Sequence, residues 1–159
     1  MNLIAVAPFW LVSALLVALA AAALEDGWRL RISNLIPLTI IILAIVAIAL
    51  AGPRIALWQN LTLFAALLVI GTVLFSARLL GGGDVKLLAS CSLWFDFSGG
   101  WRMLVIVAIA GGVLAMLILS MRLVVPEGAR RWIPLKPKSG LPYGVAIATG
   151  TAVAIWLWR

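Results

Sequence analysis

Six apolar runs separated by short polar segments make up most of the sequence. At a rise of about 1.5 Å per residue, a helix of roughly 17 to 25 apolar residues crosses a hydrocarbon core about 30 Å thick. Five runs approach or exceed that length, whereas Val85–Phe95 is short enough to be a span of a thinned bilayer, a re-entrant piece or an interfacial piece. The pattern predicts an all-α integral membrane protein, with residues 1–159 as a single domain formed by a compact bundle of six transmembrane helices. The runs are Leu3–Leu24, Leu35–Ala51, Ile55–Ala77, Val85–Phe95, Met103–Met121 and Tyr143–Trp158.

The composition supports a membrane protein and removes several kinds of chemistry. Hydrophobic residues make up 65% of the chain and charged residues 11%, against about 45–50% and about 25% in soluble domains. The chain has no histidine and a single cysteine, Cys91. The sequence therefore excludes a Ser-His-Asp triad, a Cys-His pair, a histidine-based zinc site and an internal disulfide. We expect Cys91, which lies in an apolar run, to be a small core residue.

The basic residues predict the orientation of the bundle. Cytoplasmic loops of membrane proteins carry an excess of lysine and arginine. If all six runs cross and both termini lie outside, nine basic residues face the cytoplasm and three face the outside. The inner residues are Arg29, Arg31, Arg78, Lys86, Arg122, Arg130, Arg131, Lys136 and Lys138, and the outer ones are Arg54, Arg102 and Arg159. Without a crossing at Val85–Phe95 the cluster from Arg122 to Lys138 would change sides, so the charges support six crossings.

Tryptophans near the ends of the runs are expected to form the aromatic belt that membrane proteins place at both interfaces. They are Trp28, Trp58, Trp94, Trp101, Trp132, Trp156 and Trp158.

Among the acidic residues, Asp26 and Asp84 are distinguished by their positions. Asp26 follows the first run and Asp84 precedes the fourth, so six crossings place both at cytoplasmic helix ends. Acidic side chains at membrane helix ends are costly and are candidates for function. A simple helix cap is the alternative interpretation for Asp84, because aspartate is favoured at a helix N-terminus. The remaining acids are Glu25 and Glu127 on the same side and Asp96 on the outside.

Two carboxyl groups that share one proton can hydrolyse a peptide bond. The ionised group takes a proton from water, while the protonated group polarises the scissile carbonyl. Asp26 and Asp84 are the best such pair here, and this chemistry needs no cofactor and no metal. Lys86 and Ser90, four residues apart on one helix face, form a less favoured alternative dyad. The glycines before Asp84 lack the G-x-x-x-x-G-K-[ST] spacing of a phosphate loop, so we reject nucleotide binding.

Three segments resemble the type IV prepilin peptidases, in the same order along the chain. Residues 81–88, GGGDVKLL, are similar to the family's G-x-G-D-x-K-L signature. Asp26 with residues 31–34, RISN, resembles the segment of the family's first aspartate, with Ser33 in place of the usual proline. Residues 141–144, LPYG, resemble the Pro-aromatic-Gly motif that opens the family's last helix.

The resemblance implies an intramembrane aspartic endopeptidase of the bacterial cytoplasmic membrane. Such an enzyme removes the basic leader of prepilins at the cytoplasmic face, after a glycine and before the hydrophobic pilin helix. Asp26 and Asp84 would then be the catalytic pair. The motif residues expected to bind substrate are Gly81, Gly82, Gly83 and Lys86. The glycine stretch is expected to pair with unwound substrate backbone as a strand would.

The size of the chain resembles the minimal peptidases of Flp-type (tight-adherence) pilus systems. Larger members carry an N-terminal segment with two C-x-x-C pairs that is linked to N-methylation of the pilin, so we expect leader cleavage without methylation. The expected partners are a prepilin with an apolar N-terminal helix and the lipid bilayer, and not nucleic acid. Archaeal preflagellin peptidases are a related alternative with the same motif.

Two alternatives involve no hydrolysis. In a small transporter or proton relay, Asp26 and Asp84 would carry protons or cations. In a structural membrane subunit of a pilus assembly system, both acids would be helix caps. The replacement Asp84→Asn would then be tolerated, whereas a peptidase dyad requires a titratable proton.

Overall fold

The computed structural model of the protein describes residues 2–52, 57–125 and 140–158. These residues form seven α-helices and contain no β-strand, which confirms the predicted all-α class. The helices are α1 (Leu3–Val6), α2 (Phe9–Arg29), α3 (Leu35–Ala51), α4 (Leu57–Ser76), α5 (Gly82–Ser92), α6 (Phe97–Val124) and α7 (Tyr143–Trp158).

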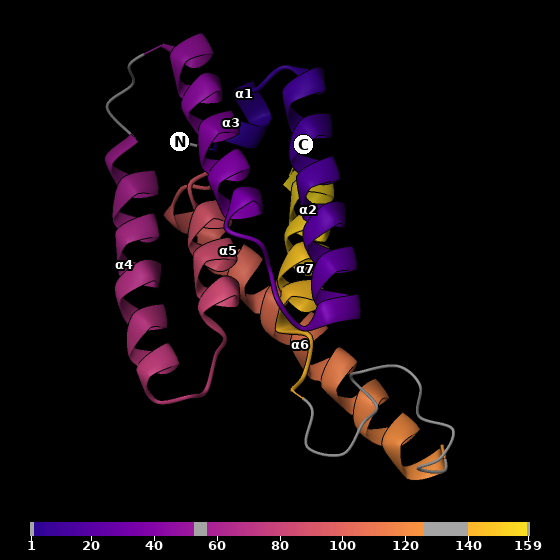
Figure 1. Ribbon diagram of the computed structural model, residues 1–159. Helices are drawn as coiled ribbons and strands as arrows, with labels where there is room; N and C mark the ends of the chain where they lie inside the picture. Colours follow the sequence, from indigo (N-terminus) through magenta and orange to yellow (C-terminus); the bar gives the residue numbers. More distant parts are fainter. Residues whose placement is uncertain (1, 53–56, 126–139, 159) are drawn as a thin grey trace.

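Consecutive helices from α2 to α7 run in alternate directions (Figure 1). α7 contacts both α2 and α6, and α5 contacts α3, α4 and α7. In the described part of the chain, α2, α4 and α6 are long and apolar enough to cross a membrane, whereas α3 and α7 are shorter apolar helices. The number of crossings and the side on which the termini lie therefore stay predictions.

The predicted first run, Leu3–Leu24, is divided between two helices. α1 ends at Val6, and α2 begins at Phe9 after Pro8. Proline lacks a backbone N–H and disfavours the helical conformation in the residue before it. Ala7 is accordingly extended, with φ −71° and ψ 140°. At its other end, α2 continues beyond the apolar run as far as Arg29.

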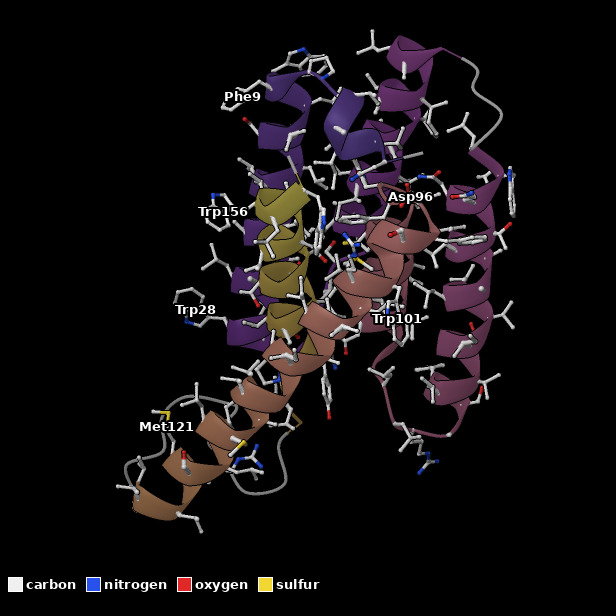
Figure 2. All side chains as sticks on the ribbon, turned by 180° about the vertical axis from the view of Figure 1, so that it is seen from behind. Phe9, Trp28, Asp96, Trp101, Met121 and Trp156 are labelled. Atoms are coloured by element: carbon white, nitrogen blue, oxygen red, sulfur yellow. The ribbon has the colours of Figure 1, made fainter. Side chains whose placement is uncertain are left out.

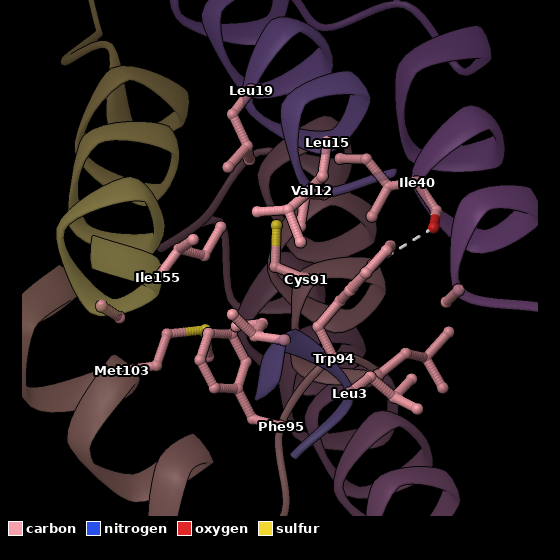
Figure 3. Packing of buried hydrophobic residues seen from close by; sticks show 14 of the residues in the cluster. Leu3, Val12, Leu15, Leu19, Ile40, Cys91, Trp94, Phe95, Met103 and Ile155 are labelled. Carbon is pink, nitrogen blue, oxygen red and sulfur yellow. Dashed lines mark hydrogen bonds between the residues drawn. The ribbon is translucent and has the colours of Figure 1, made fainter. Parts of the chain in front are cut away.

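The residues that follow the short helix α5 are buried in the hydrophobic core. The segment after it is held by protein groups: the Leu3 N–H donates to the Trp94 carbonyl at 3.0 Å, and Asn60 Nδ2 donates to the Leu93 carbonyl at 2.8 Å. Trp94 is fully buried, and its Nε1–H donates to the Ile40 carbonyl at 3.4 Å (Figure 3). The prediction that Trp94 belongs to the interfacial belt is therefore wrong. Its indole fills the core between the helices and finds its acceptor on a helix backbone.

Many large apolar side chains of the helices are exposed, as expected of a surface in contact with lipid. Trp28 and Trp156 point away from the bundle (Figure 2), and Trp101 is also exposed. Trp132 lies outside the described residues. Cys91 is buried in the core cluster, which confirms the prediction that it is a core residue.

Candidate active site

The last turn of α2 carries Asp26. Leu30 ends this helix in the left-handed conformation, with φ 52°, and its N–H donates to the Asp26 carbonyl. An acidic side chain in the last turn lies at the negative end of the helix dipole, which is unfavourable. The Asp26 side chain is also buried, with 4% of the residue exposed. A buried carboxyl group in this position needs hydrogen-bond donors from another element.

The N-terminus of α7 supplies those donors. The Val145 N–H donates to Asp26 Oδ2 at 3.2 Å, and the Gly144 backbone donates to the same carboxyl group. The first N–H groups of a helix have no acceptors within the helix and lie at the positive end of its dipole. A Cβ atom at position 144 would lie 2.9 Å from Asp26 Cγ and Oδ2. Glycine therefore allows α7 to approach the carboxyl group this closely.

Asp84 lies in the first turn of α5. Gly81 is the N-cap, extended at φ −73° and ψ 144°, and its backbone donates a hydrogen bond to the Asp84 carboxyl group. A Cβ atom on Gly81 would lie 2.7 Å from Asp84 Oδ2. Asp84 thus accepts a hydrogen bond at the start of its own helix, as a helix cap does. The same hydrogen bond fixes the direction of its carboxyl group.

The glycine stretch is less extended than we predicted. Gly82 and Gly83 already belong to α5, so only Gly81 offers extended backbone to a partner strand. A Cβ atom on Gly83 would lie 3.1 Å from the Cβ of Ile32 and 3.5 Å from its backbone N and O. Gly83 therefore lets α5 pack closely against the segment that follows α2.

Asp26 and Asp84 line a common space. Both face a cavity of about 760 Å³ between α2, the α4–α5 connection and the start of α7. Both also line a smaller cavity of about 240 Å³ beside Ile32 and the three glycines. The two carboxyl groups are close enough for their charges to interact. The structure thus brings together the two acids that the sequence analysis paired.

Three residues at the larger cavity were not predicted to belong to the site. Phe75, Arg78 and Tyr143 all line it. Arg78 was considered only as a charge that orients the bundle, yet it has a left-handed backbone with φ 60°, which is uncommon for a bulky residue. Tyr143 belongs to the LPYG segment, and that motif was the signal that could have placed it beside the acids.

A second, apolar cavity of about 300 Å³ adjoins the first one. It is lined by residues of α5, α6 and α7, and Leu80 and Tyr143 line both cavities. On α6 its wall includes Gly111 and Gly112. A Cβ atom at position 112 would meet no atom within 4 Å. The acids are therefore next to an apolar groove with open space along α6.

The alternative Ser–Lys dyad is not formed. Lys86 Nζ donates to Asn34 Oδ1 at 2.8 Å, whereas the buried Ser90 hydroxyl donates to the Leu87 carbonyl at 2.8 Å. A serine nucleophile must give its proton to the base that activates it. Here each side chain is bonded to a different partner, so this geometry does not support nucleophilic catalysis by Ser90.

The other acids have structural contacts. Glu25 Oε2 accepts from the Ser33 N–H at 2.9 Å, which ties the segment after α2 to that helix. Asp96 is the N-cap of α6, and its Oδ1 accepts from the Gly99 N–H at 2.8 Å. Glu127 lies outside the described residues. Within the described ranges, no three His, Cys, Asp or Glu side chains are grouped so that they could hold a metal ion.

Comparison with known proteins assigns the family. The model of the type IV leader peptidase family matches residues 13–119, a stretch that includes Asp26, Asp84 and the glycines before Asp84. It ends before α7. No curated protein and no solved structure matches the chain. Since the matched stretch covers more than half of the sequence and both acids of the cavity, the chain belongs to the type IV leader peptidase family.

Proposed function

We propose that this protein is an intramembrane aspartic endopeptidase that removes the leader peptide of prepilins, with Asp26 and Asp84 as the catalytic pair. The observation that carries the proposal is the shared cavity, which two carboxyl groups line from the ends of two different helices. Membership of a leader peptidase family supports peptide-bond hydrolysis. The chain has no histidine, and the Ser90 hydroxyl donates to the Leu87 carbonyl and not to a base that could activate it.

The proposed reaction uses one ionised and one protonated carboxyl group. Two nearby carboxylates repel each other, so the pair holds on to one proton, and the resulting titration belongs to the pair. The ionised group takes a proton from water, and the water oxygen attacks the carbonyl carbon of the scissile peptide. The protonated group donates a hydrogen bond to the carbonyl oxygen as negative charge develops there. When the C–N bond breaks, the proton taken from water passes to the leaving amine.

The apolar groove next to the acids is our proposed site for the apolar part of such a substrate. We propose that the pilin helix lies along α6 beside Gly111 and Gly112, because small residues let helices approach closely in a membrane. Leu80 and Tyr143, which line both cavities, would then mark the point where the helix unwinds toward Asp26 and Asp84.

The motif residues would contact the unwound backbone of the substrate and the residues next to the cleavage site. Gly81 presents extended backbone in the larger cavity, and all three glycines line the smaller one. Lys86, held by Asn34, is on the same helix as Asp84. We therefore propose Gly81, Gly82, Gly83 and Lys86 as the substrate-binding residues.

We propose that cleavage takes place at the cytoplasmic face of the bacterial inner membrane, as the orientation predicted from the basic residues implies. Six crossings would place the acids on the side that carries most of the basic residues. We propose the substrate to be a Flp-type prepilin, whose basic leader would be attracted by the charge of the carboxyl pair. A proton relay is less well supported, because both acids lie at helix ends beside one cavity, whereas transporters bind near the bilayer midplane.

Co-expression with a Flp-type prepilin tests this function. The expected result is a smaller pilin on a gel in the presence of the protein, with a new N-terminus after a glycine and before the apolar helix. A prepilin whose apolar helix carries a central Asp is the control, since it should insert poorly beside the groove and remain uncut. A wild-type protein that is present in the membrane and leaves the prepilin at full length would contradict the proposal.

A further inference from the structure

We propose that the first turn of α7, at Gly144 and Val145, is the positioning element that holds the Asp26 carboxyl group toward Asp84. This inference rests on the proposed function and adds to it residues outside the family match, which ends at residue 119. Gly144 and Val145 do not touch the reacting atoms in this account. They act through Asp26.

The Asp26 carboxyl group depends on this turn because its own helix supplies no hydrogen-bond donor at that end. The carboxyl group lies in the last turn of α2, where the free backbone groups are carbonyls and the helix dipole is negative. The donors come from across the helix–helix contact, from the Val145 N–H at 3.2 Å and the Gly144 backbone. Hydrogen bonds from N–H groups to a carboxylate are stronger than those between neutral groups, so the turn favours one orientation of the side chain.

Gly144 sets the distance between the turn and the carboxyl group. A Cβ atom there would lie 2.9 Å from both Asp26 Cγ and Oδ2, and 2.5 Å from Ile32 Cδ1. Ile32 Cδ1 is the end of a side chain that has other rotamers. The Asp26 carboxyl group is buried and bonded to the turn itself, so an alanine at 144 would displace it from its donors.

The rest of α7 keeps the turn in place. Gly150 packs directly on α6, where its Cβ would lie 2.7 Å from Val107 Cα. Most side chains on the inner face of α7 are buried, including Ala154 and Ile155 near its end. The N–H groups of the first turn are therefore presented by a helix that is fixed independently of Asp26.

The test compares two glycine-to-alanine changes on the same helix. Gly144→Ala should lower kcat by roughly 10- to 100-fold with KM within about twofold, since misplacement of a catalytic group by 1 Å costs about 100-fold. Gly150→Ala also creates a clash, but it lies five residues beyond Val145 along α7, more than one helical turn from the contact with Asp26. It should reduce the thermal stability and the yield of the protein in detergent, while the kcat of the folded fraction stays at the wild-type value.

A double variant shows whether contact with Asp26 or contact with Ile32 causes the loss of kcat in Gly144→Ala. Ile→Val removes the Cδ1 atom, so Ile32→Val relieves the contact with an alanine at 144 and leaves the contact with Asp26 unchanged. The kcat of Gly144→Ala should stay low in the Ile32→Val background. Restoration of kcat by Ile32→Val would overturn the inference and assign Gly144 to packing of the segment after α2.

A second variant covers the case in which Gly144→Ala does not accumulate in the membrane. Val145→Pro removes the N–H that bonds Asp26 Oδ2 and the Pro142 carbonyl. Position 145 is in the first turn of α7, where no N–H has a partner within the helix. The Val145→Pro variant should lower kcat in the same way as Gly144→Ala. Wild-type kcat in Val145→Pro, with Asp26→Asn inactive in the same assay, would overturn the inference alone. Activity retained by Asp26→Asn would instead overturn the proposed function.

Discussion

Asp26 and Asp84 occupy opposite ends of their helices, and this difference shapes how each is held. Asp84 begins α5 and is bonded to the cap of its own helix. Asp26 ends α2 and is bonded to the start of α7. In both cases the donors are backbone N–H groups, which stabilise a carboxylate without placing a cationic side chain between the pair. The two acids can therefore approach each other across the cavity.

At the level of single residues, the sequence predicted the two acids but not the backbone groups that form hydrogen bonds with them. Positions beside apolar runs made several acids candidates, and the resemblance of GGGDVKLL and RISN to the prepilin peptidase motifs singled out Asp84 and Asp26. The donors at residues 144 and 145 could not be predicted in the same way. Every residue except proline has a backbone N–H, so its use depends on the packing of α7 against α2, and the residue type reflects this packing only through the glycine at 144.

Gly83 is the residue whose replacement should separate folding from cleavage. Its Cβ would lie 3.1 Å from Ile32 Cβ, so alanine needs a small shift and valine a larger one. We expect Gly83→Ala to retain part of the activity and Gly83→Val to lose about 10-fold or more, because the acids move apart. The measurement is cleavage per amount of protein in the membrane fraction. Parallel losses of cleavage and of membrane-inserted protein would contradict a role at the site.

At the scale of elements, the apolar pattern predicted α3 and α7 with the bounds that the structure has. It failed where local chemistry or tertiary contacts overrode it. Pro8 divides the first run between α1 and α2. α5 begins before its apolar run, because Gly82 and Gly83 are helical and pack closely against neighbouring elements. Burial of Trp94 was not predictable from its place at a run end, since it results from the position of α5 inside the bundle.

The groove between α5, α6 and α7 gives a prediction at the same scale. Gly112→Leu should fill it without a clash, because a Cβ at 112 meets no atom within 4 Å. We expect KM for a prepilin to rise by about tenfold, equivalent to about 1.4 kcal/mol, with little change in kcat. The matched control is Val113→Leu, on the adjacent exposed face of α6. An unchanged KM in Gly112→Leu would show that the pilin helix does not use this groove.

The whole molecule is expected to cross the membrane six times, and this depends on α5. In the sequence α5 lies between α4 and α6. If α5 and α6 both cross the membrane, the C-terminal ends of α4 and α6 lie on the same side. The charge distribution supports this arrangement. Length alone does not decide it, since α5 runs only from Gly82 to Ser92. Its ends are partnered by other elements of the protein, and such partners allow a short segment to exist at membrane depth.

Cysteine labelling tests the crossing. The native Cys91 is buried, so single cysteines introduced at the exposed positions Leu79, Phe97 and Leu123 report on their own surroundings. A membrane-impermeant thiol reagent added outside intact cells should label Phe97→Cys, and should label Leu79→Cys and Leu123→Cys only after the membrane is opened. Labelling of Leu79→Cys and Phe97→Cys from the same side would mean that α5 does not cross.

Replacement of each acid by its amide tests the central claim most directly. The purified wild-type protein, Asp26→Asn, Asp84→Asn and Asp96→Asn would be compared in lipid vesicles with one prepilin, at equal amounts of folded protein. Asp96→Asn is the matched control, because asparagine caps a helix about as well as aspartate. We predict that Asp26→Asn and Asp84→Asn each lose at least about 100-fold in cleavage rate, the usual contribution of an acid or base group, while Asp96→Asn retains the wild-type rate. Cleavage within a few-fold of wild type by either Asp26→Asn or Asp84→Asn would contradict the aspartic dyad.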